Sequence, residues 1–578
     1  MQGARALVDV LIGSGVRHIF GLPGDTGVDF YDALYERRDE VAHIMTRDER
    51  SASFMADVYA RASGRLGVCE GPSGGGATYI VPGVAEAHGS AIPLLCLTSD
   101  TPVNQHGRGV LTELDQESLF RPITKWNTRV NTAATMAEMT RRAIRMATTG
   151  RPGATHLSLP ADVLEGETPD ETVYGVPEFG AAPALRTRPD SALLQRAADA
   201  IAAARRPIIV AGGGVVTSGA WDELTRLAET LNIPVATSIN GKGSIAETSP
   251  VSIGIVGGNG ARAYTNAVVC DADLVIFVGS RTDSTTTHHW HVPPLHGGVA
   301  AIQIDVEPWE IGNNYRLLVP VAGDAKLALT DLIDAIDQPA AIGARNRERV
   351  DALVAERDRY WADVERQSQV DSRPIKPQVV VRAMREVLGD DVLIVADPGT
   401  PTPYLGAQYE LRRAGRTTII PRAHGGLGYA LPGVVGAAVA APEKRVVCMT
   451  GDGSFGMSVG ELETVSRLNL PVVIVQCSNN TFGWIKELQH LYHGGRYFSV
   501  DFNAVDYAAI ARGFGLGARQ VIDPAEVKPA LAEALADGRP YFLDVVTESQ
   551  ITETPPVAAW IETTTAGRAA VAGAGQRR

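Results

Sequence analysis

The fold is decided by the stretch KRVVCMTGDGSFGMSVGELETVSRLNLPVVIVQCSNNTFGW at residues 444–484. VVCMT and PVVIVQC are apolar runs of strand length, and residues 454–468 between them have helical spacing. This pattern predicts a β-α-β unit within a parallel sheet. Asp452 and Asn479 then both follow the carboxyl ends of strands, which is the edge where open α/β sheets bind ligands.

The residue types at this edge suit a metal-bridged diphosphate. Asp452 supplies a hard anionic oxygen, Asn479 a neutral one and the carbonyl of Thr481 a third, as Mg²⁺ prefers. Glycines such as Gly453 let the backbone approach the phosphates closely, and a helix from Ser454 would direct its first N–H groups at them. Either motif alone is equally a tight turn, so the prediction depends on their joint occurrence.

Length and composition bound the rest of the chain. Its 578 residues exceed what one hydrophobic core supports, so two or three domains are expected. A hydrophobic fraction of 45% and a charged fraction of 21% are typical of a globular protein. The net charge of -13, without any long run of Lys or Arg, argues against nucleic acid as a partner.

The sequence shows no membrane or secretion signal. No stretch approaches the roughly 20 apolar residues of a membrane span, and the N-terminus lacks the basic and apolar regions of a signal peptide. The five cysteines mostly stand inside or beside apolar runs, without a CxxC pair. Such thiols are typical of reduced core residues, so we expect a cytoplasmic protein without a membrane partner.

Strands alternate with helical patterns along most of the chain. This alternation predicts an α/β fold with three domains, each built on a doubly wound parallel sheet. The first domain is expected at residues 1–170, the second at 190–337 after a linker rich in Pro, Gly and acid, and the third at 375–547. A charged helix joins the last two domains, and residues 548–578 form a frayed tail or a lid.

The GDG and NN pair resembles the cofactor motif of thiamine-diphosphate enzymes, and the spacing between Asp452 and Asn479 matches that of the family. Aligned on the following T-F-G, the family's two asparagines correspond to Ser478 and Asn479, and a slip of one residue would select Asn480 instead. The resemblance implies thiamine diphosphate bound through Mg²⁺, with the metal held by Asp452, Asn479 and Thr481. It places three further residues in the cofactor site: Gly453, Ser454 and Phe482.

The resemblance extends into the first domain. RDERSASFMADVYAR resembles the segment with the family's catalytic glutamate, which corresponds to Glu49. In the family this carboxyl group forms a hydrogen bond with N1′ of the cofactor's pyrimidine ring. The 4-amino group of that ring then becomes the imino base that deprotonates C2 of the thiazolium ring. On local sequence alone Glu49 is a solvated helix start. FGLPGDTG resembles the place where pyruvate decarboxylase has a proton-transfer Asp, which implies Asp25, although PGD is otherwise a turn.

Two loops of the third domain also resemble the family. HGGLGYALPGVVG is similar to the pyrimidine-side loop of benzoylformate decarboxylase. This similarity implies that Leu427 forces the cofactor into its bent conformation and that the Gly425 carbonyl accepts from the 4-amino group. DPGTPTP, after the apolar run VLIVA, resembles a diphosphate-binding loop with Thr400 as a donor. Without the family, both are ordinary loops.

The overall likeness is to acetolactate synthases, through SGRLGV, GGGATYIVPGVAEAH and SAIPLLCLTSDTP. The substrate residues depart from that enzyme. Asp115-Gln116-Glu117 stands where the synthase has Phe-Gln-Glu, which keeps Gln116 as a catalytic candidate. Ala161 replaces a lysine, and Trp484 replaces a methionine after the metal loop.

The segment GWIKE is more similar to 2-hydroxyacyl-CoA lyases, which carry an acid on the helix after the metal loop. Lys486 and Glu487 are the candidates there, and a solvated helix start is the alternative for each. THHWH lies close to a catalytic histidine of benzoylformate decarboxylase, which implies His288; a zinc site and a surface loop are the alternatives. AGGG and VGSR in the second domain permit FAD or the ADP part of CoA.

The resemblance implies an enzyme that makes or breaks a carbon-carbon bond next to a carbonyl. An acetolactate synthase-like carboligase acting on a 2-oxo acid is the first expectation. The alternatives are a 2-hydroxyacyl-CoA lyase, which releases formyl-CoA and an aldehyde or ketone, and a non-catalytic subunit that binds the cofactor. Family members build the active site between two subunits, which implies a homodimer or homotetramer.

Overall fold

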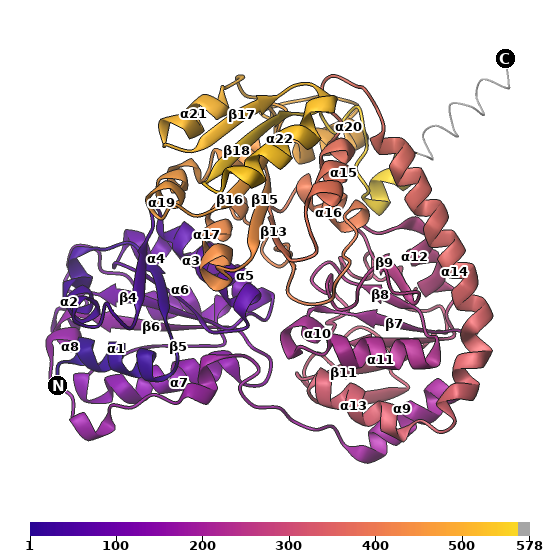
Figure 1. Cartoon of the computed structure of the whole chain (residues 1–578). Helices are drawn as coiled ribbons and strands as arrows, with labels where there is room; N and C mark the ends of the chain where they lie inside the picture. The colour runs from indigo at the N-terminus through magenta and orange to yellow at the C-terminus, as the bar shows by residue number, and fades with distance from the viewer. Residues whose placement is uncertain (565–578) are drawn as a thin grey trace. The chain divides into compact units, whose positions relative to one another are not determined.

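The computed structural model describes residues 1–564 and contains three parallel β-sheets of six strands each (Figure 1). The predicted α/β class with three parallel sheets is confirmed. Contacts divide the chain into two compact units. The first comprises Met1–Leu185, Pro421–Cys448 and Gly456–Val472, and the second comprises Arg186–Ile420, Met449–Phe455 and, among the described residues, 473–564. Within the predicted tail at 548–578, residues 565–578 lie outside the described part.

The first sheet has the order β2-β1-β3-β4-β6-β5, so the chain reverses its direction across the sheet between β1 and β3. Apolar side chains of α1, α2 and α7 form a core with β3, β4 and β6. Its strands are β1 (His18–Gly21), β2 (Ala42–Met45), β3 (Gly67–Gly71), β4 (Leu94–Asp100), β5 (Trp126–Arg129) and β6 (Ala154–Pro160). Its main helices are α1 (Gly3–Gly13), α2 (Val28–Glu36), α3 (Glu49–Ser63), α5 (Val81–Gly89) and α7 (Met136–Thr148).

Helix α17 (Ala430–Ala440) packs lengthwise along α3 in the first unit. The approach is close, because a Cβ atom on Gly436 would lie 2.1 Å from the carbonyl oxygen of Met55. Small side chains in ALPGVVGAAVA therefore let the two helices meet at short range. This contact brings the segment 421–429 to the helix that begins with Glu49.

The third sheet repeats the strand order of the first, as β14-β13-β15-β16-β18-β17. Its reversal lies between β13 and β15, and such switch points place ligands beyond the carboxyl ends of the strands. The β-α-β unit predicted from residues 444–484 is confirmed by β15 and β16. The strands are β13 (Val392–Ala396), β14 (Thr418–Ile419), β15 (Arg445–Gly451), β16 (Val472–Ser478), β17 (Gly517–Val521) and β18 (Tyr541–Val546).

The single helix predicted over residues 454–468 is wrong. The segment forms the one-turn α18 (Asp452–Phe455), a 3-10 turn (Val459–Glu461) and α19 (Leu462–Arg467). Gly456 and Gly460 explain the interruption, since a glycine inside a helix costs about 1 kcal/mol relative to alanine. A helix of one turn offers little macrodipole, so the predicted helix contribution to phosphate binding at Ser454 is not supported.

The central sheet has a different order, β12-β11-β10-β7-β8-β9, which is that of dinucleotide-binding folds. Helices α9 (Ser191–Ala203), α11 (Trp221–Leu231) and α13 (Ala325–Ala335) line one face (Figure 1). The strands are β7 (Pro207–Ala211), β8 (Val235–Thr237), β9 (Ser252–Ile255), β10 (Leu274–Val278), β11 (Ala300–Asp305) and β12 (Val319–Ala322).

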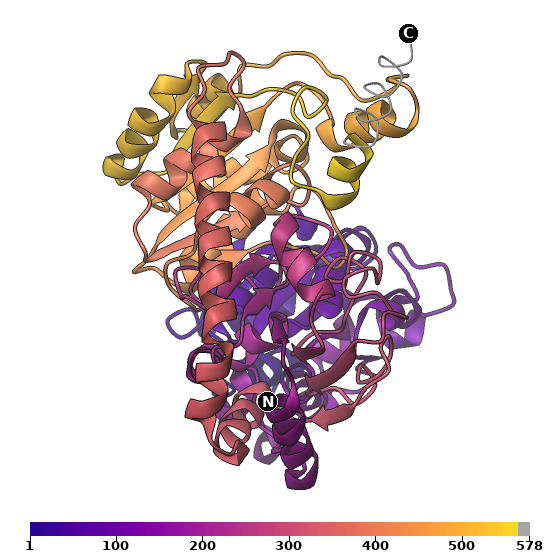
Figure 2. The same ribbon diagram turned by 90° about the vertical axis from the view of Figure 1, so that its right-hand side faces the viewer.

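The predicted charged helix is α14 (Pro339–Ser368), which spans 30 residues (Figure 2). It packs against α11 and continues to α15 (Pro377–Val387) within the second unit. Across residues 1–564 no helix combines the length and the apolar character needed to cross a bilayer. Cys69, Cys96, Cys448 and Cys477 are buried and Cys270 is exposed.

Candidate active site

The carboxylate of Asp452 lies at the carboxyl edge of the third sheet, directly after β15. Its Oδ2 atom accepts hydrogen bonds from the main-chain nitrogens of Asn479, at 2.8 Å, and Asn480, at 2.6 Å. Its Oδ1 atom accepts from the nitrogen of Gly453 at 2.9 Å. Burial raises the pKa of Asp452 to about 6, against the lowering effect of these donors. The two halves of the sequence motif therefore meet at one carboxylate.

The loop after β16 turns sharply at Asn480, whose φ of +57° lies in the left-handed region that asparagine tolerates. The Thr481 hydroxyl donates a hydrogen bond to the Val500 carbonyl at 2.9 Å. This side chain is therefore engaged within the protein and is not the expected metal ligand. The Thr481 carbonyl accepts from the Gly483 nitrogen at 2.8 Å and keeps a second lone pair. The main chain of Thr481, rather than its side chain, is thus the donor available to a cation.

Gly453 lies against the ring of Phe482, where a Cβ atom would come within 2.8 Å of a ring carbon. Only glycine fits this place without displacing the ring. The oxygens on this edge, from the Asp452 carboxylate, the Asn479 amide and the Thr481 carbonyl, are the hard donors that Mg²⁺ prefers. The residues present fit a metal-bridged diphosphate, and their ligand roles stay predictions. Ser454 is buried in the same turn.

Gln550, which sequence reasoning missed, connects the loops after β13 and β16. Its Nε2 atom donates to the hydroxyl of Thr400, at the start of α16 (Pro401–Gln408). Its Cδ atom lies 3.5 Å from where a Cβ on Gly483 would stand. The Oε1 atom of Gln550 is buried and has no hydrogen-bond partner within residues 1–564. Such an acceptor usually awaits water or a ligand, so Gln550 joins Thr400 as a candidate contact.

Lys486 and Glu487 have different environments on α20 (Gly483–Tyr492). Lys486 pairs with Asp501 at 2.7 Å near the surface. Glu487 is 1% exposed, which excludes the alternative of a solvated helix start for this residue. Burial raises the pKa of Glu487 to about 7, and its Oε2 atom lacks a partner among the described residues. Glu487 is therefore the better candidate for an acid or base.

Glu49 begins α3 in the first unit, behind Asp48, whose carboxylate accepts from the nitrogen of Arg50 at 2.8 Å and caps the helix. Glu49 is only 7% exposed, so the alternative of a solvated helix start is excluded. Burial raises its pKa. A Cβ on Gly76 would approach the Glu49 carboxyl oxygen to 3.1 Å, so a glycine there leaves room for this group.

Asp25 is exposed in a 3-10 turn (Asp25–Gly27) that follows β1. Its Oδ1 atom accepts from the nitrogen of Thr26 at 2.9 Å, which is an ordinary turn contact. The loop lies at the switch point of the first sheet, between β1 and β3. The structure thus leaves the Asp25 carboxylate accessible, and its catalytic role stays a prediction.

The loop after β4 carries the triplet that replaces Phe-Gln-Glu. Asp115 caps α6 (Gln116–Phe120) by accepting from the nitrogen of Ser118 at 3.0 Å. Gln116 is 2% exposed; its Nε2 atom donates to the Ser99 carbonyl at 2.9 Å and its Oε1 atom accepts from the hydroxyl of Thr98. The amide of Gln116 is thus engaged by β4, which favours a structural role over its predicted catalytic role.

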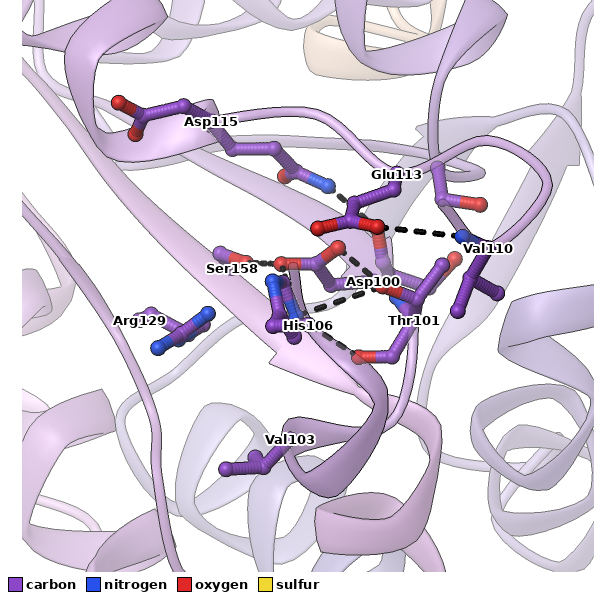
Figure 3. A network of polar contacts seen from close by, with 12 residues as sticks. Asp100, Thr101, Val103, His106, Val110, Glu113, Asp115, Arg129 and Ser158 are labelled. Carbon is purple, nitrogen blue, oxygen red and sulfur yellow. Dashed lines mark hydrogen bonds and ion pairs between the residues drawn. The ribbon is translucent and has the colours of Figure 1, made fainter. Parts of the chain in front are cut away.

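A polar network holds the same loop (Figure 3). The Glu113 carboxylate turns back to accept from the nitrogens of Gly109 and Val110, each at 3.1 Å. Asp100, at the end of β4, accepts from the Ser158 hydroxyl at 2.7 Å, and His106 lies 3.7 Å from its carboxylate. These contacts shape the loop from within its own domain.

His288 lies in the loop after β10, and its Nε2 atom is 3.6 Å from a carboxylate oxygen of Glu562. The three consecutive residues His288, His289 and Trp290 have φ of +47°, +53° and +61°. The ring centroids of His288 lie 6.3 Å from His289 and 6.1 Å from His291. Within residues 1–564 no group of three His, Cys, Asp or Glu side chains could hold a metal ion. A catalytic role for His288 stays a prediction.

Gly425 and Leu427 lie in the segment before α17. Gly425 has a φ of +74°, which favours glycine, and no described atom would lie within 4 Å of a Cβ there. The backbone conformation, rather than lack of space, therefore requires this glycine. Leu427 is partly buried. The side chains that hold this segment are Glu86, Asp57 and Arg61, none of which the sequence patterns singled out.

The strand orders, the Asp452 loop and the buried Glu49 together define a thiamine-diphosphate-dependent enzyme built from three α/β domains. The chain belongs to the thiamine pyrophosphate enzyme family, in its acetolactate synthase-like branch. It matches "Thiamine pyrophosphate enzyme, N-terminal TPP binding domain" over residues 1–119, the central domain over 194–332 and the C-terminal TPP binding domain over 397–545.

Curated relatives match along nearly the whole chain. The chain is 37% identical to the probable acetolactate synthase large subunit of Methanocaldococcus jannaschii over 556 residues, covering 94% of this chain and 92% of that protein. It is 33% identical to the acetolactate synthase large subunit of Parasynechococcus marenigrum, covering 94% and 87%. It is 30% identical to the acetolactate synthase isozyme 3 large subunit of Escherichia coli, covering 95% of each.

Proposed function

We propose that this enzyme decarboxylates a small 2-oxo acid and transfers the remaining acyl fragment to a second carbonyl compound. The observation that carries the proposal is the buried carboxyl group of Glu49, whose pKa is raised by its surroundings. A buried carboxyl group of this kind can exchange a proton with a bound partner. The acetolactate synthase names of the relatives support this direction of chemistry.

The chain's own residues divide the work between holding the cofactor and moving protons. Asp452, Asn479 and the Thr481 carbonyl would hold Mg²⁺, and Gly453 and Thr400 would contact the diphosphate. Thiamine diphosphate, when bound, supplies the nucleophilic carbon and an electron sink for the carbonyl chemistry. Glu49 would exchange a proton with the pyrimidine ring, and Gly425 and Leu427 would orient that ring.

Glu487 would be the second acid or base, because its carboxyl group is buried and its Oε2 atom has no hydrogen-bond partner among residues 1–564. This residue also favours one alternative, cleavage of a 2-hydroxyacyl-CoA to formyl-CoA and a carbonyl compound. The strand order of the central sheet supports a nucleotide there, either FAD or the ADP part of CoA.

We propose a homodimer or homotetramer in the cytoplasm, with each active site formed between two subunits. The family resemblance implies that Glu49 of one chain faces Asp452 of another, and the two residues belong to different compact units within one chain. The relatives are called large subunits, which supports a further regulatory subunit as a partner. Size-exclusion chromatography with light scattering would measure the assembly.

A substrate screen tests the proposed reaction. Purified protein with thiamine diphosphate and Mg²⁺ would be incubated with pyruvate, with longer 2-oxo acids, or with a 2-hydroxyacyl-CoA, and products identified by mass spectrometry. Acyloin-type products from the 2-oxo acids are expected. Formyl-CoA would support the lyase alternative instead. Failure to bind the cofactor would contradict both reactions.

A further inference from the structure

Glu86 is a buried carboxylate that receives a row of main-chain hydrogen bonds. It lies on α5, is 1% exposed, and accepts from the nitrogens of four consecutive residues of the first unit. The donors are Arg422 at 3.1 Å, Ala423 at 3.2 Å, His424 at 2.7 Å and Gly425 at 3.4 Å. These residues lead directly into the segment that carries Leu427.

The far end of the same segment is tied to α3. The hydroxyl of Tyr429 donates to the Asp57 carboxylate, and Arg61 bridges Asp57 at 2.8 Å and Glu86 at 3.0 Å. Asp57 and Arg61 lie on the helix that begins with Glu49. The network therefore connects both ends of residues 422–429 to one helix of the proposed active site.

This network buries more negative than positive charge, so the main-chain donors are needed to stabilise the Glu86 carboxylate. Two buried carboxylates, Asp57 and Glu86, share the single guanidinium of Arg61. Burial alone would raise the pKa of Glu86, but Arg61 and the nitrogens of His424 and Gly425 outweigh it and lower the pKa. When the N–H groups of successive residues in a loop point toward one place, they form a concave binding site for an anion. In this protein Glu86 is the anion.

We propose that Glu86 is a positioning residue for the cofactor, which rests on the proposed function of this site. Its carboxylate holds residues 422–425 in the conformation that presents the Gly425 carbonyl and the Leu427 side chain to the pyrimidine ring before the cofactor binds. A preformed loop spares the cofactor the cost of ordering it. Glu86 contacts neither the cofactor nor the substrate.

The test replaces Glu86 by an amide of the same shape. In Glu86→Gln the side-chain NH₂ faces main-chain N–H groups, so buried donors lose their acceptor, and we expect the Kd for thiamine diphosphate to rise about tenfold or more. Isothermal titration calorimetry in Mg²⁺ would measure the Kd. At saturating cofactor the KM for the substrate should not change. The kcat should stay within about threefold, since the positioning role of Glu86 does not involve the reacting atoms.

Asp273→Asn is the matched control, because Asp273 accepts from the nitrogens of Arg205 and Arg206, each at 2.8 Å, in the central domain. It should leave the cofactor Kd unchanged. If Glu86→Gln fails to fold, Ser90→Ala removes one hydroxyl donor to Glu86, at 2.7 Å, and should raise the Kd about two- to threefold.

The outcomes separate this inference from the proposed function. A wild-type protein that binds no thiamine diphosphate would overturn the proposed function and this inference with it. A wild-type protein that binds the cofactor, beside a Glu86→Gln variant of equal Kd, would overturn only the positioning role. If Glu86→Gln does not fold, an unchanged Kd in Ser90→Ala would likewise overturn the positioning role. If Glu86→Gln lowers the melting temperature but leaves the Kd for thiamine diphosphate unchanged, Glu86 has only a structural role.

Discussion

The Oδ2 atom of Asp452 lies 2.8 Å from the main-chain nitrogen of Asn479, which follows it by 27 residues. The same oxygen accepts from Asn480. The carboxylate therefore shapes the loop after β16, and that loop in turn orients the carboxylate. A cation bound at this edge would depend on both.

Asp452→Asn should weaken thiamine diphosphate binding in Mg²⁺ by about 10- to 100-fold or more. The variant loses an anionic oxygen and turns a donor toward the N–H groups of Asn479 or Gly453. Titration calorimetry with and without Mg²⁺ would measure the change. Asp523→Asn, at an exposed helix cap on α22 (Pro524–Asp537), is the control. An unchanged affinity in Asp452→Asn would refute the metal site.

Glu49→Gln should lower kcat by about 10²- to 10⁴-fold while leaving cofactor affinity within about tenfold. The amide keeps the shape of the side chain but cannot transfer a proton. Steady-state turnover and calorimetry would be compared on the same preparation. Asp48→Asn should remain active, because asparagine also caps a helix. Undiminished turnover in Glu49→Gln would rule out its role as the proton-exchanging group.

Glu487 should make stability depend on pH between about 4.5 and 7. The folded state keeps the proton up to a pKa of about 7, while the unfolded chain loses it near 4.5. The unfolded state thus binds fewer protons in this window, and stability falls as pH rises. Glu487→Gln should lack this fall, so its melting temperature relative to wild type should increase from pH 5 to pH 8.

Scanning calorimetry at several pH values would measure that difference. Lys486→Met is the control, because its pair with Asp501 lies near the surface and contributes less than about 1 kcal/mol. A difference in melting temperature that stays constant across the pH range would argue against a buried, protonated Glu487.

Gly453→Ala should disturb the ring of Phe482 and destabilise the domain by about 1–3 kcal/mol. The added methyl group would stand 2.8 Å from the ring, and either the ring or the loop must move. Urea unfolding would give the free energy, and cofactor titration the effect on binding. Gly389→Ala is the matched control, since no described atom would lie within 4 Å of its Cβ. Equal behaviour of the two variants would contradict the packing argument.

Local patterns were sufficient to predict most of the longer buried strands. VVCMT and PVVIVQC are continuous apolar runs bounded by turn residues, and such runs become the central strands β15 and β16. The edge strand β14 was missed, because Thr418–Ile419 is too short to show a period. The prediction of one helix over residues 454–468 was wrong, because the helix-destabilising effect of its glycines outweighs the helical spacing of its apolar residues.

The sequence by itself determined the fold class, because the alternation of strand and helix patterns is local, and it indicated the cofactor through the joint occurrence of the motifs at Asp452 and Asn479 and the family resemblance that they carry. It did not determine which side chain of the Lys486 and Glu487 pair is buried. It also could not reveal Glu86, whose main-chain donors lie more than 330 residues further along the chain. Burial and pairing of charges depend on which distant segments pack together, and only the tertiary structure decided them.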